Sequence, residues 1–216
     1  MTSSTGGLLV AVASCPNPPL LLVGRTGGPV AEVDELRSAC LAAIAVIIDA
    51  APEVVVIVGA DAEYDLAEPL SIAVGSELLS QAGWSGPVQR VTVPRTASPA
   101  DAALAGVRIR QRPGRVALLV MADGSACRTL KAPGYLDERA VEFDDDLTRA
   151  LLASDWATVA GLRRQPAEDL LVAGRAAWQV LAGVAETGEL VATSHYAAAP
   201  FGVWYPVISY LPDTVR

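Results

Sequence analysis

Apolar residues along the chain gather in three short unbroken runs, and each run is typical of a strand that is buried on both faces. The runs are Leu8–Ala13, Val54–Val58 and Val116–Met121. Between the first two, apolar residues recur at helical spacing over Ala31–Ala50, with Cys40 on the buried stripe. A strand, a helix and a strand in succession predict a parallel sheet with a right-handed crossover.

The remaining pattern predicts further helices and strands around that sheet. We expect a weak helix over Leu70–Gln81, a short strand over Val88–Val93, and a helix over Ser98–Gln111 with Ser98 as its N-cap. Two or three helices follow, one marked by Phe143, Leu147 and Leu151 and another by Leu171, Gly174, Trp178 and Leu181. Strands over Leu190–His195 and Val203–Tyr210 come last.

These elements predict the α/β class, with a largely parallel central sheet flanked by helices. We expect a single domain over residues 1–216. The alternative is a domain boundary near Ala132–Asp137, but the helices after it are amphipathic and need the sheet to cover them.

Composition and charge narrow the function classes. Hydrophobic residues make up 52% of the chain and charged residues 19%, which is the reverse of a disordered chain. The formal net charge is −8, and the one basic run, Arg108–Arg115, alternates with apolar residues as a solvated edge does. We therefore expect no nucleic-acid partner.

The cysteines and the apolar runs predict a cytoplasmic protein. Cys15, Cys40 and Cys127 are odd in number, lie far apart and form no C-x-x-C pair. Met1–Gly7 is short and polar, unlike a secretory leader, and no apolar run is long enough to span a bilayer. We therefore expect no membrane partner.

Each of the three apolar runs ends in polar residues. In open parallel sheets, ligands bind at the carboxyl ends of the strands. If the three strands are neighbours, their polar ends converge on one cleft that suits a small molecule. The residues concerned are Cys15 and Asn17, then Asp61 and Glu63, then Asp123, Ser125, Cys127 and Arg128.

A family resemblance follows from the order of these segments and of later ones. The chain resembles, over nearly its whole length, the LigB superfamily of class III extradiol ring-opening dioxygenases and its Memo-like branch. It is most similar to short, alanine-rich actinobacterial members. The segments are Ser14-Cys-Pro-Asn-Pro-Pro19, Gly59-Ala-Asp61, Asp123-Gly-Ser-Ala126, Ala132-Pro-Gly-Tyr135, Glu142-Phe-Asp144, Gly174–Gly183, and Tyr196 with Ala199–Tyr205.

The resemblance implies an iron site that this chain lacks the residues to form. The family's enzymes bind ferrous iron through two histidines and a carboxylate. The matching positions here hold Cys15 or Asn17, Asp61 and Ala126, and the one histidine is His195. We therefore expect no cofactor, and a LigB-like protein with a degenerate iron site that binds a small ligand in the cleft or serves as a partner subunit.

The second hypothesis is an enzyme, either an active dioxygenase or a catalyst with a non-standard site. Asp123, Cys127 and His195 would be its catalytic residues. Cys127 beside Arg128 is either a nucleophile or an inert packing residue. His195 with Tyr196 is either an acid/base pair or a structural pair.

Asp61, Glu63 and Asp123 could together offer a magnesium ion oxygen ligands. The simpler interpretation, which we favour, is that these carboxylates cap helices or accept hydrogen bonds from loop amides.

A third hypothesis is an interaction protein. Phe201, Trp204 and Tyr205 near the end of the chain could bury in a homodimer, although aromatic residues on closing strands also suit the core. Dinucleotide-binding, P-loop, serine-hydrolase and zinc-protease motifs are missing from the sequence, so those classes lose their usual support.

Overall fold

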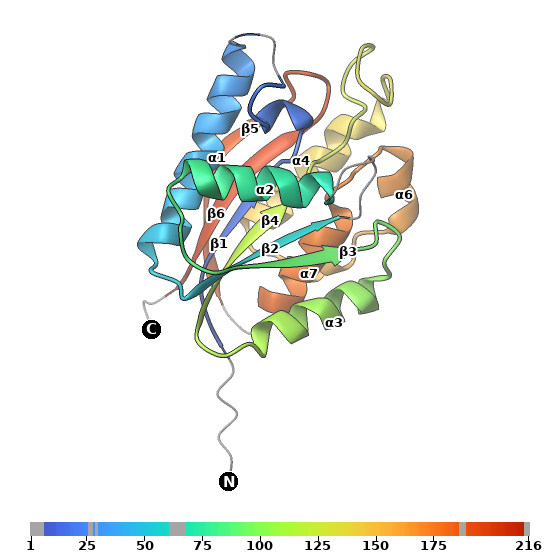
Figure 1. The fold of residues 1–216 in the computed structure, drawn as a ribbon. Coiled ribbons are helices and arrows are strands. Elements are labelled where there is room, and N and C mark those ends of the chain that lie inside the picture. The colour runs from blue at the N-terminus through green and yellow to red at the C-terminus, as the bar shows by residue number, and fades with distance from the viewer. Residues whose placement is uncertain (1–6, 26–27, 29, 61–67, 186–188, 214–216) are drawn as a thin grey trace.

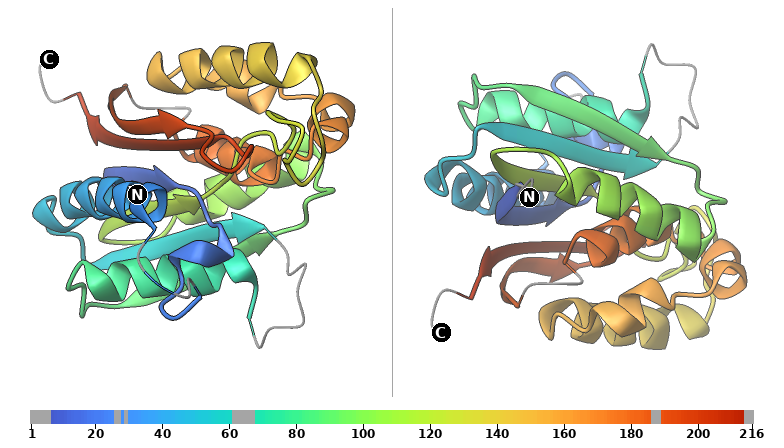
Figure 2. Two further views of the ribbon diagram at one scale, coloured as in Figure 1. Left: turned by 90° about the horizontal axis from the view of Figure 1, so that it is seen from above. Right: turned by 90° about the horizontal axis from the view of Figure 1, so that it is seen from below.

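One mixed sheet with helices on both faces carries the fold, which confirms the predicted α/β class (Figures 1 and 2). The computed structural model describes residues 7–25, 28, 30–60, 68–185 and 189–213. The strands in these residues are β1 (Leu8–Cys15), β2 (Val54–Ala60), β3 (Val88–Val93), β4 (Arg115–Met121), β5 (Leu190–Ala198) and β6 (Tyr205–Pro212). The helices are η1 (Pro19–Leu21), α1 (Ala31–Asp49), α2 (Leu70–Gln81), α3 (Pro99–Arg110), α4 (Arg139–Leu152), α5 (Trp156–Ala160), α6 (Arg164–Asp169) and α7 (Arg175–Ala185).

The sheet is parallel over most of its width. The strand order is β3-β2-β4-β1-β6-β5, and the four strands from β3 to β1 run parallel. β6 runs antiparallel to β1, and β5 runs antiparallel to β6. The carboxyl ends of β1, β4 and β2 therefore lie at one edge of the sheet, together with the turn between β5 and β6 (Figure 1). We call this the carboxyl edge.

The core divides into two layers because successive strand residues point to opposite faces. Val12 and Leu118 belong to the layer that includes residues of α3 and α7, whereas Ala13 and Leu119 belong to the layer that includes residues of α1 and α2. Cys40 is fully buried in the second layer, as the helical spacing predicts.

The predicted start of α3 is confirmed, whereas the helices after β4 differ in number from those that the sequence predicts. The side chain of Ser98 accepts a hydrogen bond from the Asp101 amide, so it caps α3 as predicted. Where the sequence predicts two or three helices, the described residues form four, α4 to α7. The sequence predicts Leu171 on the helical stripe, but it lies before α7 with a φ of 55°. A left-handed residue interrupts a right-handed helix, which is why the stripe begins later.

The segment between β4 and α4 folds back onto the sheet instead of linking two domains. The Gly134 amide donates to the Ala126 carbonyl at 2.9 Å, and the Asp137 amide donates to the Cys127 carbonyl at 3.0 Å. The Arg128 amide donates to the carbonyl of Gly202, in the turn between β5 and β6, at 3.0 Å. The alternative boundary near Ala132–Asp137 is therefore wrong, and the fold is a single domain.

Candidate functional site

The loops that follow β1 and β4 meet at the carboxyl edge. The Ala122 amide donates to the Cys15 carbonyl at 2.8 Å. Next to this bond along both segments, the Asn17 amide donates to Oδ1 of Asp123 at 2.7 Å, and the side chains of Asn17 and Asp123 are half-buried. Burial, and then the negative charge of Asp123, raises the pKa of Tyr205, the first residue of β6. The structure thus brings together Asn17 and Asp123, which the sequence placed at the ends of two separate strands.

Asp61 and Glu63, predicted as ligand-binding residues, lie outside the described residues. β2 is described as far as Ala60, whose carbonyl accepts a hydrogen bond from the Ser71 hydroxyl at 3.0 Å. Since β2 pairs with β4 in parallel, the chain leaves β2 at the same edge as Asp123. The role of the two carboxylates stays a prediction.

Ser125 belongs to a buried polar network that the sequence analysis missed. Asp144 in α4 is fully buried and accepts the Ser125 amide at 2.9 Å and its hydroxyl at 2.6 Å. Burial raises the pKa of Asp144, although the hydrogen bonds from Ser125 and the charge of Arg128 oppose that rise. Nη1 of Arg128 lies 3.5 Å from Oδ2 of Asp144, and its guanidinium carbon lies 4.6 Å from the centre of the Trp204 ring.

The network ties α4 and Trp204, the residue before β6, to the loop after β4. The Trp204 amide donates to the Ser125 carbonyl at 2.8 Å, and its indole N–H donates to the Thr148 hydroxyl at 3.0 Å. The Trp204 carbonyl accepts the Gly124 amide at 2.8 Å. These bonds satisfy polar groups that would otherwise be buried without partners, so the loop after β4 has a fixed conformation.

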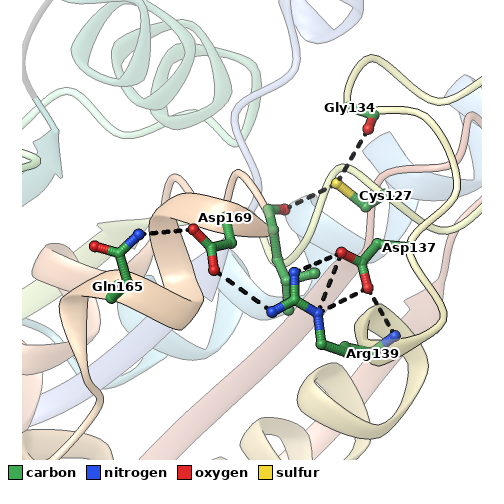
Figure 3. Close-up of polar contacts among 7 residues, drawn as sticks. Cys127, Gly134, Asp137, Arg139, Gln165 and Asp169 are labelled. Carbon is green, nitrogen blue, oxygen red and sulfur yellow. Dashed lines mark hydrogen bonds and ion pairs between the residues drawn. The ribbon is translucent and has the colours of Figure 1, made fainter.

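Cys127 lies in surroundings that suit packing more than nucleophilic chemistry. Its side chain is 1% exposed, and its thiol lies 3.4 Å from the Leu170 carbonyl oxygen and 3.7 Å from that of Gly134 (Figure 3). Burial, followed by the charge of Asp137, raises the pKa of the thiol. A nucleophilic cysteine needs the opposite shift, because the thiolate is the reactive form.

A surface ion-pair chain lies beside Cys127 (Figure 3). Arg139 pairs with Asp137 at 2.7 Å and with Asp169 at 3.5 Å, so it joins the start of α4 to α6. The hydrogen bonds from Arg139 lower the pKa of Asp137 to about 2. The group is exposed and paired, which is the ordinary state of a solvated ion pair.

His195 and Tyr196 lie on β5, on the outer strand of the sheet. Nε2 of His195 is 2.8 Å from the hydroxyl of Ser209 on β6, and burial lowers the pKa of the imidazole. Tyr196 packs against the layer under α1, whereas Cys127 belongs to the layer on the other face of the sheet. The structure therefore separates Tyr196 from Cys127, and the described partner of His195 is a neighbouring strand residue.

Cys15 is fully buried at the end of β1. Its thiol lies 4.0 Å from the Cys40 carbonyl oxygen. A hydrogen bond with Cys15, and then burial, raises the pKa of Cys40 well above its ordinary value. Cys15 therefore faces the core under α1, in the layer against which Tyr196 also packs.

A groove opens at the carboxyl edge between the loop after β4 and the turn that joins β5 to β6. Its volume is about 740 Å³. Gly202 lets the two segments approach, because it has a φ of +77° and an added Cβ would lie 2.6 Å from Ala132 Cβ. We call it the Lys131 groove, and it is lined by Arg128, Thr129, Leu130, Lys131, Leu136, Pro200 and Phe201.

The residues do not fit the iron site of the ring-opening enzymes. That site needs two histidines within one protomer, and the sequence contains one. Within the described ranges, no group of three or more histidine, cysteine, aspartate or glutamate side chains could hold a metal ion. The magnesium alternative involves Asp61 and Glu63, so it stays a prediction.

The fold and the carboxyl edge define a single-domain α/β protein with a mostly parallel sheet. It is similar to the crystal structure of the uncharacterized protein JW3007 from Escherichia coli K12, with a TM-score of 0.55 and 10% identity over 94% of this chain and 99% of that one. At this identity the likeness shows the fold alone. Comparisons with family models and with curated proteins find no match. No helix in the described part of the chain has the length and apolar character needed to cross a membrane.

Proposed function

We propose that this chain is a LigB-like protein that lacks the iron centre of the ring-opening enzymes and binds a small molecule at the carboxyl edge. The observation that carries the proposal is the contact between Asn17 and Asp123 at the same edge as the Lys131 groove. Two loops from neighbouring parallel strands are held together there, in the position where α/β sheets bind ligands. The order of the sequence motifs supports the family part of the proposal.

The lack of iron follows from the ligand set. His195 is the only histidine, and it lies beside Ser209 on the antiparallel side of the sheet. Ring-opening by the family's usual route needs the two-histidine site and a further histidine as acid/base. The proposed protein therefore keeps the family scaffold and its edge without that chemistry.

Metal analysis tests this part directly. Purified protein incubated with ferrous iron without oxygen, and then desalted, is expected to retain far less than one iron atom per chain. It is also expected to consume no dioxygen when catechol is added. His195→Ala serves as the control, since its iron content should equal that of the wild type. One iron per chain that is lost in His195→Ala, or catechol-dependent oxygen uptake, would overturn the proposal.

Ligand binding is tested by thermal denaturation against a collection of small molecules. A compound that binds only the folded protein raises its melting temperature by mass action. We expect such compounds, and we expect the shift to shrink in variants of the Lys131 groove. A collection that produces no shift would remove the binding part of the proposal.

The proposal includes a cytoplasmic homodimer. The three cysteines are all unpaired, as in a compartment that keeps thiols reduced. Trp204 and Tyr205 are buried within the chain, so they offer little surface to a partner. Val191 on β5 pairs with Leu211 on β6, and the two are 56% and 45% exposed. These two strands therefore suit a dimer interface better than Trp204 and Tyr205 do. Light scattering separates a dimer from a monomer.

A further inference from the structure

The Lys131 groove offers an apolar surface that the chain itself leaves open to solvent. Leu130 is 61% exposed and Leu136 is 44% exposed, and both line the groove with the half-buried Pro200 and Phe201. Single exposed leucines are ordinary, but two that line one concave surface beside a proline and a phenylalanine indicate a binding site. The volume of about 740 Å³ falls in the range of pockets for small molecules.

The two cations of the groove differ in how far they are already compensated. Arg128 lies 3.5 Å from the Asp144 carboxylate and 4.0 Å from that of Asp145, and it is stacked on Trp204. Lys131 is the only lysine in the chain. Among the described residues it has no hydrogen-bond or ion-pair partner. Lys131 is therefore the cation of the groove that remains available to a ligand.

The walls of the groove are held in place before any ligand arrives. The Arg128 amide bonds to the Gly202 carbonyl, and the Ala132 amide bonds to the Thr129 carbonyl at 3.1 Å. The buried network of Ser125 and Asp144 fixes the start of the same loop. A preformed wall lowers the entropy cost of binding, so a modest ligand gains affinity from it.

We propose that the Lys131 groove selects small molecules that have an apolar body and one anionic group, with the apolar body on Leu130, Leu136 and Phe201 and the anion on Lys131. This inference rests on the proposed function, because it names the class of ligand at the carboxyl edge. The chain carries a net charge of −8, so an anion gains little from the overall field and depends on this local cation.

The test uses three probes that separate the two parts of the ligand. Anilinonaphthalene sulfonate is apolar and anionic, phenylnaphthylamine is apolar and neutral, and inorganic sulfate is anionic alone. Fluorescence titration is expected to show the sulfonate binding more tightly than the neutral compound. Sulfate is expected to compete only weakly, since it gains nothing from the leucines.

Two groove variants and two matched controls assign the contacts. Lys131→Met is expected to weaken the sulfonate about five- to tenfold, the worth of one charge-assisted contact at a partly exposed site, and to leave the neutral probe unchanged. Leu130→Asn is expected to weaken both probes. Arg90→Met on β3 removes one cation at the opposite side of the sheet, and Leu104→Asn changes an exposed leucine of α3, so neither should alter binding.

A second readout uses the single lysine and needs no variant. Reductive methylation with isotopically labelled formaldehyde places reporter methyl groups on Lys131 and on the chain's amino terminus. The Lys131 signal is expected to shift when the sulfonate is added and to stay in place with the neutral probe. Equal affinity of the two fluorescent probes, with an unmoved Lys131 signal, overturns the anion selectivity and leaves a small-molecule site standing. Sulfonate binding that no groove variant changes would overturn the groove itself, and iron at full occupancy would overturn the proposed function.

Discussion

Asp144 is the residue on which the loop after β4 depends most. It is fully buried, and its carboxylate accepts two hydrogen bonds from Ser125 and faces Arg128. Asp144→Ala would leave the amide and the hydroxyl of Ser125 without an acceptor and would remove the nearer of the two carboxylates beside Arg128. We therefore expect the free energy of unfolding to fall by about 3 kcal/mol. Urea denaturation measures the loss. Asp146→Ala is the control, because Asp146 is 62% exposed and its ion-pair partner in the described part of the chain is Arg149. A loss of equal size there would contradict the assignment.

The raised pKa of Asp144 fixes the sign of a pH effect. Burial raises this pKa, so the folded state holds the proton more tightly than the unfolded chain does. The stabilising effect of that proton is present at low pH and is lost as the pH rises through the folded-state pKa. As the pH rises from about 4, near the ordinary pKa of an aspartate, through the raised pKa of the folded state, the stability of the wild type should therefore fall relative to that of Asp144→Asn, which cannot titrate. A difference that stays constant over this range would count against the burial.

Part of this network could have been predicted from the sequence. Ala140, Asp144, Leu147 and Leu151 recur at helical spacing, and all four are buried in α4. That spacing separates Asp144 from Asp145 and Asp146, which are exposed. The partners could not be predicted, because Ser125 and Arg128 reach Asp144 only once the loop has folded back on the sheet.

At the scale of elements, α3 and α7 approach each other closely through glycines. A Cβ on Gly106 would lie 2.6 Å from the Val180 carbonyl oxygen, and one on Gly183 would lie 2.8 Å from the Ala103 carbonyl oxygen. Backbone atoms cannot move aside as a side chain can. We therefore expect Gly106→Ala to lower the free energy of unfolding by about 2 kcal/mol.

Gly161→Ala is the matched control for this contact. Gly161 follows α5 with a φ of −79°, and its added Cβ would come no closer than 3.3 Å to another atom. Thermal or urea denaturation of both variants should show a clear loss for Gly106→Ala and a much smaller change for Gly161→Ala. Equal losses would mean that the close approach of the two helices matters little.

The elements that could be predicted are those whose signals are local. Ser98 caps α3 through its own first turn, and Cys40 follows a stripe within one helix. The two short helices α5 and α6 have five and six residues, too few to show a helical period. The sequence predicts that Asn17 and Asp123 converge only if their strands are neighbours, and the pairing of β1 with β4 fulfils that condition.

At the scale of the whole molecule, the first strand of the chain depends on elements from its last third for pairing and for cover. β1 lies between β4 and β6, so the first strand of the chain needs one of the last. Trp178 in α7 is fully buried, and its indole N–H donates to the Ser14 hydroxyl at 2.9 Å. Residues 1–138 by themselves therefore lack both β6, which pairs with β1, and α7, which covers one face of their sheet.

This arrangement predicts that residues 1–138 do not fold alone. β1 and β4 would lose the cover of α7, and β1 would become an open edge with its unpaired backbone facing water. We expect the fragment to show no cooperative transition by circular dichroism, whereas the whole chain should unfold in one transition followed equally by circular dichroism and tryptophan fluorescence. Co-expression with residues 139–216 is the control, because restored signal would show that the cut itself is harmless. A cooperative transition in the fragment alone would mean that the parallel strands form an independent folding unit. The contacts with β6 and α7 would then contribute less to stability than their burial indicates.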